Sequence, residues 1–141
     1  MGDGAQPRPA VPLRSIDWEE LISVDGDLSV RAAAVMMTVN GVGALIVTGF
    51  DDAPAVVTER DITRAVATGV DLDGCSCGAI AEPALVTAEA DETIVDVAER
   101  LLEEGIRHIP VVCGDDIVTV LSVRDLLAAV LAATRAPDTK E

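Results

Sequence analysis

The stretch TVLSVRD (residues 119–125) decides the fold, because a second version of it, VVTERD (residues 56–61), stands 64 positions earlier. When the sequence is shifted by 64 residues against itself, residues 22–66 align with residues 86–130 without a gap. Eleven of these 45 pairs are identical. A gapless register over this length indicates an internal repeat, so we interpret the chain as two copies of one unit of about 60 residues.

The second copy gives the secondary structure of the unit most clearly. A short extended segment precedes Thr93, which reads as the N-cap of a helix that ends at Gly105. Strands at 109–112 and 117–121 follow, and Ser122 opens a second helix. The unit is therefore β-α-β-β-α, and the predicted fold class is α/β (α+β), with two repeats packed sheet to sheet as one pseudo-two-fold module.

The domain organisation follows from the repeat and from the proline-rich start of the chain. Each copy alone would have a marginal core, which favours one shared module. We predict a disordered tail at 1–14, a first repeat at 15–67, a linker with a short helical turn at 68–83, a second repeat at 84–133 and a disordered tail at 134–141.

Composition excludes several functional classes. The chain carries 25 acidic and 10 basic residues, a formal charge of −15, which disfavours binding to nucleic acids and anionic lipids. Residues 32–50 form an uncharged run of 19, near the length that spans a bilayer. The run contains Asn40 and three glycines, and its repeat partner is charged, so it reads as helix, turn and strand rather than a membrane span.

The cysteines Cys75, Cys77 and Cys113 are odd in number, and no secretory signal precedes them. Reduced thiols and a cytoplasmic location are therefore expected. Cys75-Ser76-Cys77 is a weak candidate for metal binding, but zinc sites need four ligands, so a structural or incidental role is the favoured reading. We expect no metal site.

The repeated VVTERD and TVLSVRD segments resemble the cystathionine β-synthase (CBS) domain, and two copies resemble the pair called a Bateman module. Further matching segments are GVGALIV (residues 41–47), GIRHIPVV (residues 105–112) and the DETI that begins at Asp91. The resemblance covers residues 15–131. It implies a stand-alone regulatory pair that binds an adenosine ligand, such as AMP, ADP, ATP, NAD or S-adenosylmethionine, between the repeats.

The resemblance also implies two sets of ligand-binding residues, in which the Asp of each T/S-x-x-D motif contacts ribose and the Ser or Thr contacts phosphate. The preferred pocket would use Val86, Thr87, Arg107, His108, Ile109, Pro110, Ser122, Arg124 and Asp125. The other pocket would use Ile22, Ser23, Ala44, Leu45, Thr58, Arg60 and Asp61.

General chemistry supports these roles and also offers simpler ones. A carboxylate accepts charge-assisted hydrogen bonds from two ribose hydroxyls, and a helix N-terminus favours an anion. Arg60, Arg107, Arg124 and His108 are candidate phosphate contacts, and Arg64 is a weaker one. However, T/S-x-x-D before a helix is equally a capping box that needs no ligand. His108, the chain's one histidine, has a surface or packing role as its alternative.

Two positions depart from the family pattern. Ala55 and Thr119 stand where the family has glycine three residues before the Thr or Ser, and their side chains would narrow the clefts. The second copy has Arg107-His108 where the first has Gly43-Ala44, which favours the Ser122–Asp125 pocket for a nucleotide.

The leading functional reading is a regulatory nucleotide sensor that acts through an unidentified protein partner. We expect no catalytic residues and no required cofactor. The nearly chargeless helix at 32–37 suggests a homodimer interface. The alternative function, favoured by Ala55 and Thr119, is a structural dimerisation module whose clefts bind no nucleotide.

Overall fold

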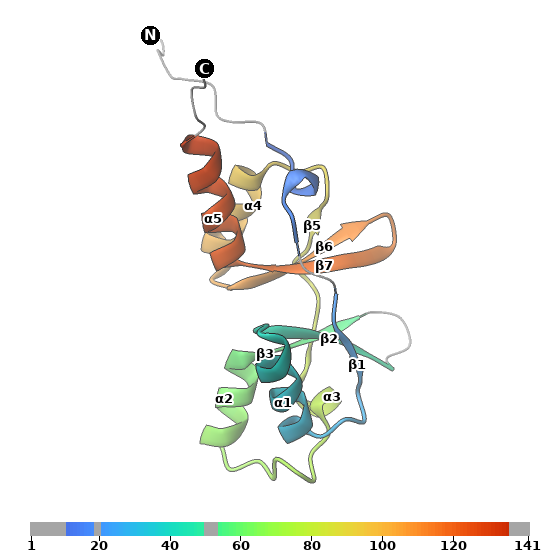
Figure 1. Cartoon of the computed structure of the whole chain (residues 1–141). Coiled ribbons are helices and arrows are strands. Elements are labelled where there is room, and N and C mark those ends of the chain that lie inside the picture. Colours follow the sequence, from blue (N-terminus) through green and yellow to red (C-terminus); the bar gives the residue numbers. More distant parts are fainter. Residues whose placement is uncertain (1–10, 19–20, 50–53, 136–141) are drawn as a thin grey trace.

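The computed structural model describes residues 11–18, 21–49 and 54–135. Two lobes are stacked, one for each repeat, and their sheets face one another across the middle of the molecule (Figure 1). The helices lie on the outer sides of the sheets. The expected α+β architecture of two β-α-β-β-α units is confirmed.

The first lobe has a sheet in the order β1-β2-β3-β4. Its strand β1 is parallel to β2, and the other neighbours are antiparallel. The elements are β1 (Ser23–Asp25), α1 (Val30–Asn40), β2 (Ala44–Thr48), β3 (Ala55–Thr58) and α2 (Glu59–Ala67), followed by α3 (Cys77–Ile80) and β4 (Glu82–Pro83).

The second lobe has a sheet in the order β5-β6-β7, again with a parallel and an antiparallel pair. Its elements are β5 (Ala88–Glu89), α4 (Ile94–Glu104), β6 (His108–Cys113), β7 (Asp116–Ser122) and α5 (Val123–Thr134). The first strand lies at Ala88–Glu89 rather than at the predicted Val86 and Thr87, because Ala88 and Glu89 pair with Val111 and Val112 of β6.

Matching helix ends explain why the two sequences form the same elements. Helices α1 and α4 both end at a left-handed glycine, Gly41 with φ 66° and Gly105 with φ 66°. A side chain there would be strained, so glycine is the favoured residue. Helices α2 and α5 both begin with a complete capping box, Thr58 with Asp61 and Ser122 with Asp125.

Each repeat receives a buried residue from the segment that precedes the other repeat. Leu13, in the short 3-10 helix η1 (Leu13–Ser15), is fully buried in the core of the second lobe. Cys77, 64 positions later, is fully buried in the core of the first. The backbone contacts match: Leu13 N donates to the Glu92 carbonyl at 2.9 Å, and Cys77 N donates to the Leu28 carbonyl.

These contacts correct the limit of the N-terminal tail. Pro12 forms a bridge with Thr93, and buried Leu13 anchors residues that the sequence predicts to belong to a disordered tail. The ordered fold therefore includes residues 11–14. At the other end, α5 continues through Thr134, one residue into the predicted C-terminal tail. Residues 1–10 and 136–141 lie outside the described part of the chain.

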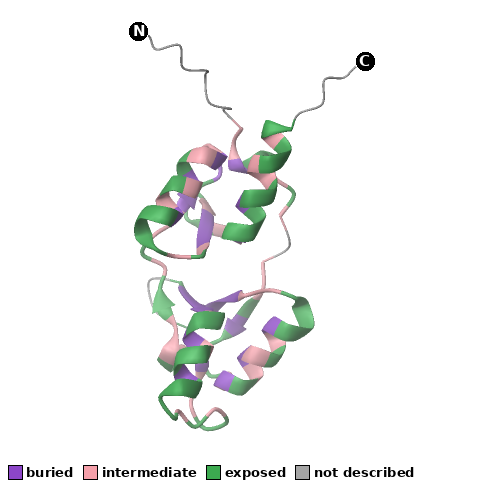
Figure 2. Ribbon diagram, turned by 90° about the vertical axis from the view of Figure 1, so that its left-hand side faces the viewer, coloured by how far each residue is buried: buried purple, intermediate pink, exposed green. Residues whose placement is uncertain are grey.

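A small apolar cluster joins the two sheets. Ala44, Ile46 and Val56 of the first sheet form its buried part, and Ile117 and Val120 of β7 pack against it. Figure 2 shows buried residues along the strands and exposed residues on the outer helices. The sheet-to-sheet packing expected from the sequence is therefore observed.

The uncharged run at 32–50 forms α1 and β2 within its described residues. None of the described helices is long and apolar enough to cross a membrane. In α1, Ala33 and Met37 are buried in the core of the first lobe, whereas Val35 and Val39 are exposed. Only part of the predicted interface helix is therefore available to a second molecule.

Candidate functional site

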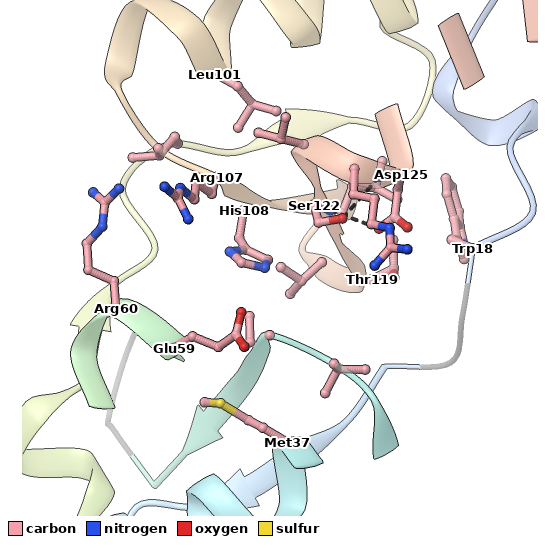
Figure 3. Close-up of a pocket in the computed structure, with 18 of the residues that line it drawn as sticks. Trp18, Met37, Glu59, Arg60, Leu101, Arg107, His108, Thr119, Ser122 and Asp125 are labelled. Carbon is pink, nitrogen blue, oxygen red and sulfur yellow. Dashed lines mark hydrogen bonds between the residues drawn. The ribbon is translucent and has the colours of Figure 1, made fainter. Parts of the chain in front are cut away.

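A cleft of about 1080 Å³ lies between the two repeats. It is lined by four segments (Figure 3): the turn before β2, the start of α2, the turn before β6 and the junction of β7 with α5. Trp18, which precedes β1, lines it as well. Both repeats thus contribute the chain segments where their strands meet their helices.

The Ser122–Asp125 capping box lies on one wall of this cleft. Asp125 Oδ2 accepts a hydrogen bond from Ser122 N at 2.9 Å, and Ser122 Oγ accepts one from Asp125 N at 3.0 Å. Asp125 is exposed, and among the described residues its Oδ1 accepts no hydrogen bond. The carboxylate is therefore held in place and still has an oxygen for a ligand.

Three arginines line the same cleft. Arg60 comes from the first repeat, and Arg107 and Arg124 come from the second. All three are exposed, and none forms an ion pair with another described residue. They provide local positive charge on a chain whose net charge is −15, as an anionic ligand requires.

His108 and Glu59 approach each other across the repeat boundary, with Gly43 between them. A Cβ atom at Gly43 would lie 2.6 Å from Glu59 Oε1 and 2.9 Å from His108 Nε2, so a larger residue would displace both side chains. Burial lowers the pKa of His108 below its usual value, although the carboxylates of Glu59 and Asp125 oppose that effect. The imidazole is therefore mostly neutral at pH 7.

The Thr58–Asp61 capping box is more enclosed. Asp61 is 7% exposed, and its Oδ2 accepts from Thr58 N at 2.9 Å and from Thr58 Oγ1 at 3.0 Å. Arg64 Nη1 lies 3.6 Å from Asp61 Oδ1 and 3.4 Å from Glu82 Oε2. Both oxygens of Asp61 thus have partners within the protein.

The structure divides the predicted site residues differently from the two expected pockets. This one cleft is lined by members of both sets: Arg107, His108, Ser122, Arg124 and Asp125 with Ile22, Ala44 and Arg60. The remaining members lie in the described chain but do not line it: Val86, Thr87, Ile109, Pro110, Ser23, Leu45, Thr58 and Asp61.

The reason for this difference is the pseudo-two-fold arrangement. Ile22 precedes the first strand of the first repeat, yet it lines the cleft that holds the second repeat's Ser122. Ile109 and Leu45 are fully buried among the cores of their own lobes. Side chains alternate between the two faces of a strand, so neighbouring strand residues cannot all face one cleft.

Trp18, Glu59 and Met37 line the cleft although sequence reasoning did not select them. Glu59 follows Thr58 directly, so its position at the start of α2 was a usable signal. Thr119, one of the departures from the family pattern, is buried and lines the cleft, whereas Ala55 is buried and pairs with Pro83.

The cysteines do not form a metal site within the described residues. No group of three or more His, Cys, Asp or Glu side chains is placed there to hold an ion. Burial raises the pKa of the Cys77 thiol, which disfavours the thiolate that metals bind. The packing role weighed for Cys77 therefore agrees with its place in the core.

Comparison with protein families identifies the repeated unit. The CBS domain model matches twice, at residues 13–68 and 77–132. The chain belongs to the CBS domain family. The segment beginning at Leu13 is part of the first match, as its burial in the fold indicates.

Several proteins with CBS domains resemble this chain. A CBS domain protein from Pyrobaculum aerophilum, solved in complex with AMP, is 30% identical with a TM-score of 0.72, covering 86% of this chain and 99% of that one. A protein of Pyrococcus horikoshii is 25% identical with a TM-score of 0.79, covering 94% of this chain and 98% of that one. Both superpose over nearly the whole described CBS pair.

A curated relative is Hypoxic response protein 1 of Mycobacterium tuberculosis, which is 27% identical over 100 residues, 70% of each chain. A protein of Methanocaldococcus jannaschii is 28% identical over 117 residues, and the match covers 82% of this chain but 41% of that protein. The CBS pair thus spans less than half the length of the latter relative.

Proposed function

We propose that this CBS pair binds an adenosine nucleotide in the cleft that holds Ser122 and Asp125, and that binding regulates a partner protein. The observation that carries the proposal is the exposed Asp125 carboxylate, fixed by its capping box in a cleft that three arginines also line, none of which has an ion-pair partner among the described residues. The AMP complex of the Pyrobaculum aerophilum relative supports the choice of ligand.

The chemistry assigns a part of the ligand to each group. Asp125 accepts hydrogen bonds from the two ribose hydroxyls. The phosphate lies by the N-terminus of α5, where the helix dipole favours an anion, and the cleft arginines neutralise its charge. Ile22 and Ala44 contact the base.

The regulatory step is a shift between two relative orientations of the repeats. A ligand that touches both repeats favours the orientation in which the two walls of the cleft fit it. The module acts without catalysis, in the cytoplasm, as a homodimer that presents the altered surface to its partner. The exposed Val35 and Val39 of α1 contribute to the dimer interface.

The second candidate function is a structural interaction module whose clefts bind no nucleotide. The observation that favours it is Thr119, which is buried in the cleft wall where the family has glycine. Both capping boxes are also complete without a ligand.

Isothermal titration calorimetry of the full chain with AMP, ADP, ATP, NAD and S-adenosylmethionine separates these functions. We expect at least one to bind, and Asp125→Asn to weaken that binding at least about tenfold because a charge-assisted hydrogen bond is lost. Asp61→Asn is the matched control and keeps the wild-type affinity. No heat with all five ligands supports the interaction module and overturns nucleotide binding.

A further inference from the structure

We infer that Trp18 is the wall against which the planar base of the ligand stacks, and that the chain therefore holds one nucleotide, on the Asp125 side. The inference rests on the proposed function, since it names the residue that selects a base within the proposed cleft. It also explains why two similar repeats provide unlike sites.

Trp18 is held in the cleft by the segment that precedes it. Leu13 N donates to the Glu92 carbonyl and Arg14 N donates to the Ala90 carbonyl, both at 2.9 Å, so this segment is tied to the second lobe. Trp18 is half-buried, packs against the second core and lines the cleft with Asp125. A large aromatic ring is thus fixed and still partly accessible.

The cleft presents three kinds of groups in the order that a nucleotide requires. Figure 3 shows Trp18 beyond Asp125 at one end of the view, His108 in the middle, and Arg107 and Arg60 toward the other end. An aromatic ring, a carboxylate and cations correspond to base, ribose and phosphate. Every base has a π-face, so a tryptophan at the base end provides a stacking surface.

The pseudo-equivalent of Trp18 is Glu82, 64 positions later. Glu82 lies in β4 beside Val56, and its Oε2 is 3.4 Å from Arg64 Nη1. Arg64 in turn lies 3.6 Å from Asp61. The first repeat's carboxylate is thus connected through an arginine to the residue that replaces the tryptophan.

The second repeat lacks the arginine that makes this connection. The residue 64 positions after Arg64 is Ala128, whose methyl group carries no charge and therefore cannot neutralise Asp125. Asp125 forms no ion pair with the described residues, and it is exposed where Asp61 is buried. The repeats thus differ at two pairs of equivalent positions, Trp18 with Glu82 and Arg64 with Ala128. These differences leave Asp125 open to a ligand, whereas Asp61 is enclosed by side chains of the protein.

Trp18 is the chain's one tryptophan and the chain has no tyrosine, so its fluorescence reports on this residue alone. We expect AMP to quench that fluorescence with the same midpoint as calorimetry and a stoichiometry of one per chain. Trp18→Leu weakens AMP binding at least about fivefold, since base–aromatic stacking carries that much affinity. Trp18→Phe retains an aromatic ring and is expected to keep most of the AMP affinity. It is the folded control in case Trp18→Leu fails to fold.

Glu82→Leu is the matched control, and its AMP affinity stays within about twofold of wild type. If AMP binds with full affinity to Trp18→Leu, or if two molecules bind per chain, the inference is overturned while the proposed function stands. If wild-type protein gives no heat with any adenosine nucleotide, the proposed function fails and the inference fails with it.

Discussion

Leu13 occupies in the second lobe the place that Cys77 occupies in the first, so each core is completed by the segment leading into the other repeat. Leu13→Ala therefore removes a fully buried side chain from a core to which it is not adjacent in sequence. We expect the free energy of unfolding to fall by about 2–5 kcal/mol. Urea denaturation measures this change.

Leu85→Ala is the control for that substitution, because Leu85 is 84% exposed. Its effect is expected to stay within about 0.5 kcal/mol, as for most surface changes. Equal losses in the two variants would contradict the anchoring role of Leu13.

A second prediction concerns the Ser122 cap. Ser122→Ala removes the oxygen that accepts the Asp125 N–H and is expected to cost about 1 kcal/mol of stability without any ligand. Ser122→Gly costs only about a few tenths, because glycine is itself tolerated at an N-cap. Chemical denaturation of the ligand-free variants tests the capping role separately from binding. An unchanged Ser122→Ala midpoint would count against it.

A third prediction concerns pH. The pKa of His108 in the folded chain lies below its ordinary value of 6.5, mainly through burial, with Arg107 adding to the effect and Glu59 and Asp125 opposing it. As pH falls through that ordinary value, the unfolded chain takes up the proton first, so the folded state loses stability. His108→Gln should remove this part of the loss between about pH 7 and pH 5.

NMR titration checks the same group directly, because one histidine gives one titrating signal. Glu59→Gln is expected to lower the pKa of His108 further, since the Glu59 carboxylate raises it in the wild-type protein. A pKa at or above 6.5 in the wild-type protein would contradict the burial argument.

A fourth prediction concerns assembly. Val39 on α1 is 76% exposed, and a charge in an apolar interface is costly to bury. Val39→Asp should convert the proposed homodimer into a monomer in light scattering. Glu104→Gln, on an exposed position of α4, is the control and should remain dimeric. A wild-type mass of 14.6 kDa would overturn the dimer.

Sequence reasoning predicted the repeat, the element order and the capping boxes because these depend on local signals. Each of these signals spans only a few positions. They are a glycine after a helix, an N-cap residue three positions before an acidic residue, and alternating apolar residues in a strand. The same signals recur in both copies, such as Gly41 with Gly105, so each copy supported the reading of the other.

The residues that line the cleft are grouped differently from the two predicted pockets, because the grouping depends on which lobe each connecting segment packs against. A three-residue segment such as Leu13–Ser15 has no periodicity, so its sequence does not say which core it joins. Trp18 follows that segment into the cleft.

The segments that contain Leu13 and Cys77, each packed in the other repeat's lobe, also affect the order in which the chain folds. Leu13 is synthesised early, but its backbone N–H can bond the Glu92 carbonyl only after the second repeat has been made. The first lobe likewise lacks its contact with Cys77 until residue 77 has been made. Closing such long loops costs chain entropy before the contacts form, so joining the two halves is a late step. We therefore expect the two halves to unfold together, and a ligand that binds both walls of the cleft to stabilise the whole chain against unfolding.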